Sequence, residues 1–548
     1  MRITHYALNK RPKANPLCIL HYALQSYLTL PSFMSDSRVK KTLLNAKVSL
    51  LFYFITLALS FFSRKIFLDY LGANFVGLTG TLGNILGYLN LAELGVGAAI
   101  GFNLYKPLQQ NNKEEIINLI SIFGYYYKNI GLIVLGAAIV VSLFIPLIFG
   151  DSGFNYLLIF FAFYSFLISS LLGYFNNYRS VIFDADQRGY MIAMYSQSFN
   201  VLKTLLQMAS AYYLQNLYLW VAIELIFGII YTLILNWRIS VVYPWLKCSI
   251  TRGKKEATTH PNILKSTKQI FIHKIKDFIL NQSDQLWIFL FASLKMVAYY
   301  GNYVLLAGKI TALFNTVLAS SGAGVGNLVA EDNKSRILSV FWELMAIRYL
   351  IAGTVCFCLY VLINPFISVW LGKEYILSNA ILIVFLVNQF IFTTRGTVDS
   401  FNYAYGHYND IWSAWTEGIL TIVFTLFFGV KYGLLGILIA KALTYLPIIV
   451  IWKPMYLFRD GFKIQWFTYW PKVFKYFIAL AVCGIFAKLC LSLVTIDPAQ
   501  SLFKWLVYAS LCFTVFTIPY SLAIFWFCPG GKNLIHRLPL DKLKIIKH

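Results

Sequence analysis

The sequence predicts an all-α, polytopic membrane protein with about 14 transmembrane helices, and three observations carry this prediction. The chain of 548 residues is 59% hydrophobic and only 12% charged, with a mean hydropathy of +0.66. A water-soluble domain could not bury this much apolar surface in its core. The apolar residues form runs of about 20 residues or more, which is long enough to cross a bilayer. The basic residues gather between these runs.

Fourteen apolar runs are long enough to span a membrane. They fall near 46–63, 78–102, 120–148, 155–175, 190–214, 217–237, 275–294, 300–326, 339–370, 376–394, 411–429, 432–452, 473–493 and 503–527. The second and eighth runs are rich in glycine, so their spans are the least regular. The connections at 149–154, 215–216 and 430–431 are little more than turns, which leaves no room there for an external domain.

The basic residues alternate from loop to loop. If the N-terminus is cytoplasmic, the outer loops hold only Arg64, Lys65, Lys295, Lys373, Lys431 and Lys504. Such an imbalance satisfies the positive-inside rule for an even number of spans, so both termini are expected in the cytoplasm. The net charge of +24 therefore indicates contact with anionic membrane lipids rather than with nucleic acid.

Hydropathy and charge divide the chain into six predicted segments. These are a cytoplasmic tail at 1–44, a six-helix bundle at 45–237, a basic cytoplasmic linker at 238–268, a second six-helix bundle at 269–455, two additional helices at 456–528 and a basic cytoplasmic tail at 529–548. The first tail lacks the apolar region and cleavage site of a secretory signal. Met34 begins a conventional basic lead-in, so the preceding residues are either an upstream start or a loose tail.

Two short matches across the linker predict a parallel repeat. Asn112, Lys113 and Ile116 follow a Gly-x-Gly cluster, as do Asn333, Lys334 and Ile337. The segments "YRSVIFDADQRGY" and "RGTVDSFNYAYGHY" form the second match. Both matches lie six spans apart, and because six is even the two bundles share one orientation. That arrangement places a substrate site between the bundles.

Four segments together resemble the polysaccharide-export branch of the multidrug/oligosaccharidyl-lipid/polysaccharide (MOP) flippase superfamily, which includes the Wzx-type O-antigen flippases. They are "SRKIFLDYLGANFVGLTG", "YRSVIFDADQRGY", "HKIKDFILNQSDQLWIFLF" and "AYYGNYVLL". The resemblance covers about 40–530 and implies a transporter of the bacterial inner membrane that works by alternating access. It implies an undecaprenyl-diphosphate-linked oligosaccharide as substrate, with a polysaccharide polymerase and glycosyltransferases as partners.

The seventh span carries the clearest polar stripe. Lys274, Asp277, Asn281 and Asp284 recur at i, i+3, i+7 and i+10, which places them on one helix face. Ionisable groups inside a bilayer are costly and usually face a cavity. Lys274 and Asn281 are therefore substrate-binding candidates, and Asp277 and Asp284 are ion-coupling candidates. The alternative for Lys274 and Asp277 is a position among the cytoplasmic headgroups.

Further candidates come from other embedded charges. Arg64, Lys65, Lys309 and Arg395 are expected to bind an anionic substrate, and Asp399 is a third ion-coupling candidate. Lys65 and Asp69 would meet at i and i+4 if the first helix continues, which would leave Arg64 free to grip diphosphate oxygens. Similar flippases line a cationic cavity with arginines in this region. The alternative for Arg64 is an interfacial contact with lipid phosphates.

Two other functions stay open at this stage. A cation-coupled multidrug exporter of the same fold should favour acidic cavity residues, whereas Lys and Arg predominate among the embedded charges here. A polytopic enzyme of the same pathway needs catalytic groups, but the histidines lie in tails, loops and span edges, and no ATP-binding loop is present. The eight cysteines lack metal-site spacing. We therefore expect a non-enzyme without metal or cofactor.

Overall fold

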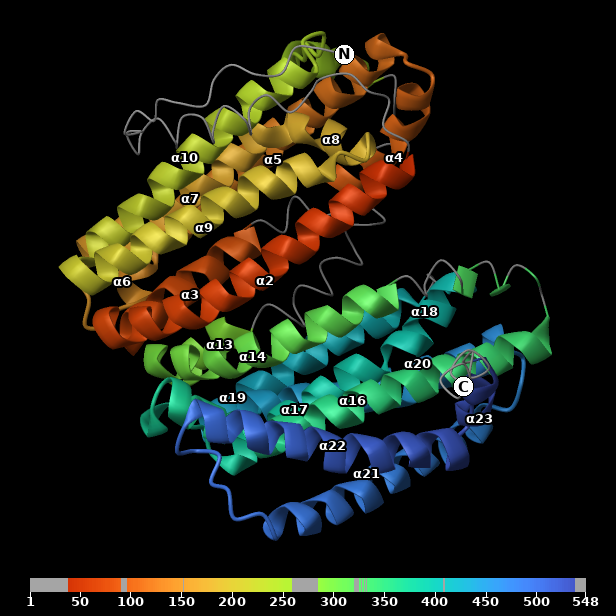
Figure 1. The fold of residues 1–548 in the computed structure, drawn as a ribbon. Helices are drawn as coiled ribbons and strands as arrows, with labels where there is room; N and C mark the ends of the chain where they lie inside the picture. Colours follow the sequence, from red (N-terminus) through yellow and green to blue (C-terminus); the bar gives the residue numbers. More distant parts are fainter. Residues whose placement is uncertain are drawn as a thin grey trace, which may run out of the picture.

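The computed structural model describes residues 38–89, 96–150, 152–258, 284–319, 325–326, 328–329, 331, 333–407 and 410–537. Throughout these residues the secondary structure is helical, with no β-strand. The predicted all-α class is therefore confirmed. The helices form two groups that lie side by side and are inclined to each other (Figure 1).

The first group contains the helices of the N-terminal half. They are α2 (Arg38–Leu71), α3 (Ala73–Leu89), α4 (Val96–Gln109), α5 (Lys113–Leu143), α6 (Ile145–Ile148), α7 (Tyr156–Phe175), η2 (Asn177–Ser180), α8 (Val181–Ala185), α9 (Gly189–Leu214), α10 (Leu217–Val242) and α11 (Ile250–Glu256). Helices α2 and α9 pack together, as do α7 and α10. The apolar side chains of this first group share one buried cluster, which includes Phe75, Phe123, Phe163 and Phe183.

The second group contains the helices of the C-terminal half. They are α13 (Asp284–Phe291), α14 (Leu294–Ala319), α16 (Lys334–Trp370), η3 (Lys373–Tyr375), α17 (Asn379–Thr394), α18 (Gly396–Ala404), α19 (Ile411–Tyr445), η4 (Leu446–Trp452), α20 (Lys453–Tyr456), η5 (Leu457–Gly461), η6 (Trp466–Thr468), α21 (Tyr469–Ser492), α22 (Leu502–Phe527) and α23 (Gly531–Arg537). Helices α21 and α22 pack against each other, and α22 also packs on α16. They form the outer edge of this group (Figure 1).

Within the described residues, nine helical segments are long and apolar enough to cross a membrane. The predicted runs that lie wholly within the described residues fall largely on helices, and three features lower the number of spans counted by length and hydropathy. Helix α3 is only 17 residues long. Helices α9 and α14 have 26 residues each, but they carry more polar side chains. The segment Trp412–Gly461 is one helical stretch that contains two predicted runs.

The chain reverses direction inside α19. Gly433 has φ 54° and ψ −130°, which is a conformation open to glycine and strained for other residues. A Cβ on Gly436 would lie 1.9 Å from the carbonyl oxygen of Phe428, whereas eight residues of continuous helix would separate these positions by about 12 Å. The predicted turn at 430–431 is therefore present and shifted by two residues.

Helix α2 is longer than its apolar run. The run was expected to end near 63, but the helix continues to Leu71. Arg64, Lys65 and Asp69 accordingly lie within its last turns and not in a loop after it. Hydropathy marks only the apolar part of a helix, since charged residues have good helix propensity and can extend it.

The predicted repeat is visible at the start of α5 and α16. Asn112 caps α5 by accepting a hydrogen bond from the backbone N–H of Glu115, and Asn333 caps α16 in the same way through Arg336, both at 3.1 Å. Asparagine is a favoured N-cap because its side chain satisfies a free N–H of the first turn. Ile116 and Ile337, four residues after each cap, are both buried. The matched residues thus have the same structural role in both halves.

The predicted linker begins inside a helix. Helix α10 continues to Val242, and the short helix α11 then packs against α5. The backbone N–H of Ser249 donates to Oγ of Ser121 at 3.2 Å, and Nε of Arg252 donates to Oδ1 of Asn118 at 2.5 Å. The first part of this connection is therefore held against the N-terminal half.

The orientation in the membrane gives a first testable prediction. Cysteines introduced singly as Thr258→Cys and Ser152→Cys, with the native cysteines removed, should lie on opposite sides because α5 begins near α11 and ends near Ser152. We expect an impermeant maleimide to label intact cells at position 152 and only permeabilised cells at position 258. Labelling of position 258 in intact cells would contradict the cytoplasmic linker.

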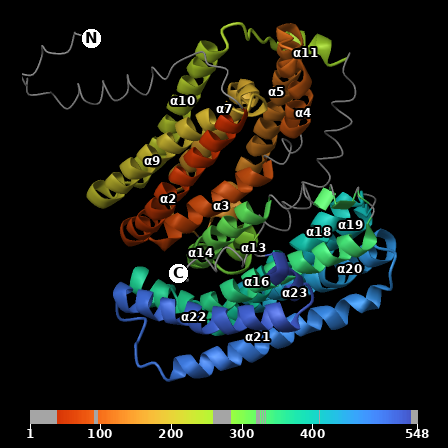
Figure 2. The same cartoon turned by 45° about the vertical axis from the view of Figure 1, so that its right-hand side comes forward.

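The two halves meet where α3 lies against α13 and α14. A Cβ on Gly77 would lie 2.0 Å from the carbonyl oxygen of Leu294, so only glycine permits this backbone contact. From this junction the two groups diverge toward the ends that carry α4 and α11 on one side and α18 and α20 on the other (Figures 1 and 2). The predicted orientation assigns the diverging ends to the cytoplasmic side.

Candidate functional site

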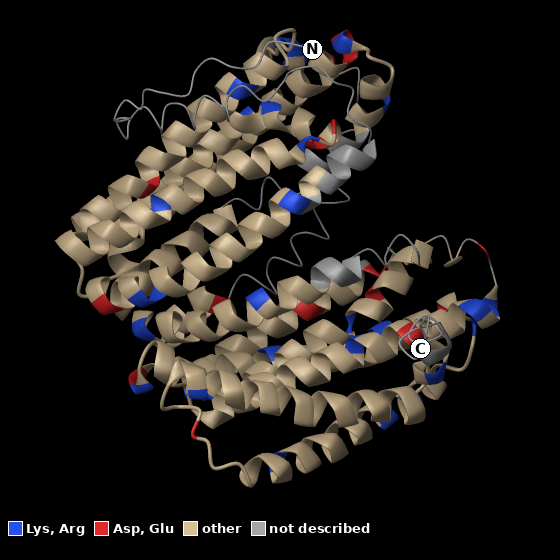
Figure 3. Cartoon of the chain, in the orientation of Figure 1, with Lys and Arg blue, Asp and Glu red and all other residues tan. Residues whose placement is uncertain are grey.

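Most charged residues lie at helix ends, but several lie part-way along the helices of both halves (Figure 3). Charges in such positions need a partner or water, because an isolated charge in hydrocarbon is unfavourable. The contacts of these charges define two sites. One surrounds Arg64 at the junction of the halves, and the other surrounds Asp284 and Arg395 in the C-terminal half.

Arg64 connects the two halves. Its Nε donates to Oδ1 of Asn302 at 2.7 Å, and its Nη2 donates to the carbonyl oxygen of Ala298 at 2.8 Å. Asn302 is fully buried. Both acceptors are neutral, and the guanidinium forms no ion pair with the carboxylates of the described residues. The site therefore retains a net positive charge.

A cavity of about 290 Å³ lies beside the Arg64 guanidinium. Arg64, Thr79, Gly80, Phe166, Trp220 and four further aromatic or aliphatic side chains of α2 and α3 line it. Nε1 of Trp220 is buried without a hydrogen-bond partner. The cavity thus combines the cationic Arg64 side chain with aromatic faces, a combination suited to anionic oxygens attached to rings.

Lys65 and Asp69 form the predicted i, i+4 pair. Their charged groups lie 3.1 Å apart, with 48% and 37% of the side chains exposed. The pair exists because α2 continues past the apolar run. An exposed pair of this kind contributes little to stability. Its consequence is local: Asp69 pairs with Lys65 and does not neutralise Arg64.

Lys309 lies on the same face of α14 as the Arg64 contacts. At 100° per residue, position 309 falls between 298 and 302 around the helix, three turns further along. Its backbone carbonyl accepts a hydrogen bond from the hydroxyl of Tyr53 on α2 at 2.8 Å. Helices α2 and α14 therefore run antiparallel across the junction. Arg64 and Lys309 lie at different positions along this pair of helices.

Asp284 is paired with a lysine far away in the sequence. Nζ of Lys441 lies 2.8 Å from Oδ2 of Asp284, and the hydroxyl of Tyr300 donates to the same oxygen at 3.2 Å. Only 14% of the Lys441 side chain and 17% of the Asp284 side chain are exposed. Three helices supply these groups: α13, α14 and α19.

Arg395 lies close to this pair. It lies in the connection between α17 and α18, and its Nε is 3.0 Å from Asp399. Its Nη1 is 4.0 Å from Oε1 of Glu417, which is 1% exposed. Arg395 also interacts electrostatically with Lys441. The Asp284 and Arg395 pairs therefore form one polar network inside the C-terminal half.

The predicted residues thus fall into two sites rather than one. Arg64 contacts Ala298 and Asn302 on one face of α14, whereas Tyr300, on the opposite face, reaches Asp284. The structure brings Asp284, Asp399 and Arg395 into one network, and keeps Arg64 and Lys65 at the junction. Lys274, Asp277 and Asn281 lie outside the described residues.

The sequence did not identify every member of these sites. Lys441 and Glu417 belong to the embedded charges of the sequence but were not among the site candidates, and neither were Tyr300 and Asn302. Lys441 and Asp284 are separated by 157 residues, so helical periodicity cannot relate them. A similar pair in the N-terminal half joins Lys203 to Glu224 at 2.7 Å. Embedded charge was the only sequence signal for these groups.

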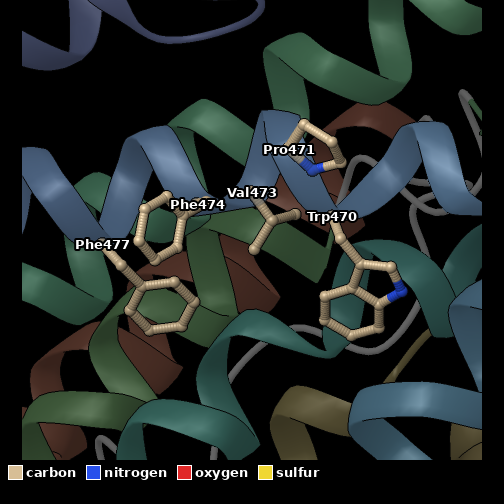
Figure 4. A pocket seen from close by; sticks show the side chains of 5 residues that line it. All are labelled: Trp470, Pro471, Val473, Phe474 and Phe477. Atoms are coloured by element: carbon tan, nitrogen blue, oxygen red, sulfur yellow. The ribbon is translucent and has the colours of Figure 1, made fainter.

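Two further features are not parts of these sites. An open groove of about 330 Å³ runs along α21, lined by Trp470, Pro471, Val473, Phe474 and Phe477 (Figure 4). Its lining has no charged group, as expected for a surface that faces lipid. In the part of the chain that the structure describes, no cluster of three His, Cys, Asp or Glu side chains is arranged to hold a metal ion.

The fold is that of a multi-pass helical membrane protein and is similar to the folds of a solved flippase and a solved transporter. No family model matches the sequence, and no curated protein matches it. Among solved structures, the lipid II flippase MurJ in an inward closed conformation aligns with a TM-score of 0.63 and 14% identity, covering 90% of this chain and 100% of MurJ. An inward-facing multidrug resistance MATE family transporter of the MOP superfamily aligns with a TM-score of 0.51 and 16% identity, covering 74% of this chain and 95% of the transporter. These likenesses show a shared fold.

Proposed function

We propose that this protein is a flippase that moves a lipid-linked oligosaccharide across the bacterial inner membrane by alternating access. The expected substrate carries undecaprenyl diphosphate and serves surface polysaccharide biosynthesis. The observation that carries the proposal is Arg64, a guanidinium without a carboxylate partner among the described residues, which contacts the C-terminal half and lines an aromatic cavity of the N-terminal half. The shared fold with a flippase supports it.

The chemistry of Arg64 fits a diphosphate. A guanidinium binds phosphate oxygens with parallel charge-assisted hydrogen bonds, and it stays charged when buried. Trp220, Phe67 and Phe75 offer apolar faces for the carrier or for sugar rings. Since the net charge of the site is positive, an anionic headgroup gains electrostatic attraction there without displacing an internal carboxylate.

The two halves supply the expected mechanism. They touch along α3, α13 and α14, and glycine at position 77 allows their backbones to approach closely. Rocking of one half against the other about this junction would expose the Arg64 site alternately to each side, as in transporters built from repeats. Hydrogen bonds from Arg64 to α14 would break and re-form in such a cycle.

A multidrug exporter is the second candidate, because a transporter of that kind shares the fold. Binding of cationic drugs requires a carboxylate that is free to pair with the drug. Asp284, Asp399 and Glu224 are each within 3.0 Å of a lysine or arginine. The pairing of these acids favours the anionic substrate. An enzymatic function has no such support from the fold.

The proposal is tested by complementation. Expression of this chain in a strain that lacks its own O-unit flippase should restore surface polysaccharide, seen as ladder-like bands on a gel. The matched comparison is a strain that lacks drug exporters, in which the chain should leave resistance to cationic drugs unchanged. Restored resistance without restored polysaccharide would contradict the proposal and favour the multidrug exporter.

A further inference from the structure

Asp284 is a largely buried carboxylate, 17% exposed, and its countercharge belongs to the protein. The ammonium of Lys441 and the hydroxyl of Tyr300 both contact its Oδ2, at 2.8 and 3.2 Å. Helix α19 holds Lys441 in this position from the arm that follows the reversal at Gly433. The carboxylate of Asp284 and the hydroxyl of Tyr300 are oxygen ligands of the kind that bind a metal cation. Here the positive charge beside Asp284 is the ammonium of Lys441, which is part of the chain.

The surroundings of the pair are electrically balanced. Three acids, Asp284, Asp399 and Glu417, are matched by three bases, Lys441, Arg395 and Arg348. Arg348 interacts electrostatically with Asp399 and donates to the carbonyl oxygen of Thr393 at 3.3 Å. Counted over these six side chains, the formal charges cancel.

An exchangeable alkali cation at Asp284 would compete with Lys441 for the carboxylate. Such cations need several oxygen ligands, often carboxylates and carbonyls in helical transporters. The displaced ammonium would then stay in a poorly solvated position, subject to electrostatic repulsion from Arg395. That arrangement places two like charges in a medium of low dielectric constant, which is strongly unfavourable.

We infer that Lys441 is a built-in counter-ion that makes the Asp284 site of this protein independent of sodium or another alkali cation. Ion coupling at Asp284 then involves only a proton or the movement of Lys441 itself. The physiological meaning of this inference rests on the proposed transport function. The ion pair between Lys441 and Asp284 is independent of that function, and its effect on cation binding can be measured on the purified protein.

The experiment measures thermal stability of the purified full-length chain in detergent, in sodium chloride and in choline chloride of equal ionic strength. A cation that binds the folded state raises Tm, whereas choline is too large for the site. The wild type should have the same Tm in both salts. Lys441→Ala exposes the charge of Asp284, so sodium should raise its Tm by several degrees over choline.

Three variants make the result specific. Lys441→Ala combined with Asp284→Asn should lose the sodium effect, because the carboxylate is gone. Lys441→Gln keeps a hydrogen-bond donor at the site and should show the sodium effect if the alanine variant does not accumulate. Lys488→Ala removes an exposed lysine from α21 and should behave as the wild type.

Two outcomes would overturn the inference. One is sodium stabilisation of the wild type that disappears in Asp284→Asn, since Asp284 would then already bind an exchangeable cation. The other is a folded Lys441→Ala or Lys441→Gln protein with no sodium effect. Neither result depends on flipping activity, so failure here leaves the complementation test intact, and failure of complementation leaves the Tm comparison intact.

Discussion

Replacing Asp284 by asparagine is expected to destabilise the protein strongly. The substitution preserves volume but leaves the buried ammonium of Lys441 without its partner at 2.8 Å. Breaking one side of a buried ion pair costs about 3–5 kcal/mol, because the remaining charge is poorly solvated. We therefore expect a lower Tm and reduced abundance of Asp284→Asn in the membrane, in addition to reduced export.

The partner substitution tests this explanation. Removing both charges in Asp284→Asn with Lys441→Met should recover most of the lost Tm, since paired removal of buried charges is often close to neutral. Asp69→Asn is the matched control, because it breaks the exposed pair with Lys65 and should change Tm little. If Asp284→Asn alone melts like the wild type, the ion pair contributes nothing to folding.

The sequence predicted the helices well and their ends less well. Apolar runs identify where a chain crosses the membrane, because the bilayer requires about 20 apolar residues per crossing. They do not show that α2 continues through Arg64 to Leu71, since charged residues also form helix. Nor do they show that α10 extends to Val242 into the predicted linker.

Local rules predicted what depends on nearby residues. Asn112 and Asn333 were predicted only as matched residues of a repeat, and the side-chain preferences at helix starts explain why both are caps. The Lys65–Asp69 pair follows from the spacing of i and i+4. Each interaction joins groups within one turn of helix, so the sequence contains all the information needed.

The sequence did not predict which residues pair when they are far apart along the chain. Nothing local indicates that Asp284 meets Lys441, 157 positions away, or that Arg64 meets Asn302, 238 positions away. The high cost of burying a charge predicted that these groups need partners or a cavity. Which partner each group finds depends on how α13, α14 and α19 pack, and tertiary packing is not encoded in a periodic pattern.

Arg64→Ala is expected to abolish export. The change removes the guanidinium from the cavity and also its hydrogen bonds to Asn302 and Ala298. Each hydrogen bond to a charged group contributes about 1.5–3 kcal/mol, so loss of two to the substrate diphosphate would weaken binding by two orders of magnitude or more. The measurement is restored surface polysaccharide in the flippase-deficient strain, normalised to protein abundance in the membrane.

Two further variants distinguish substrate binding by Arg64 from a purely structural role, in which Arg64 only holds α2 against α14. Arg64→Lys keeps the charge but not the planar fork, so export should fall partly. Asn302→Ala removes the acceptor on α14 and leaves the guanidinium, so export should persist if Arg64 binds substrate and fail if the hydrogen bond is what matters. Lys504→Ala, which removes an exposed lysine in the first turn of α22, is the control with unchanged export. Normal export by both Arg64 variants at wild-type abundance would exclude the cavity role, because neither variant retains a guanidinium for the diphosphate oxygens.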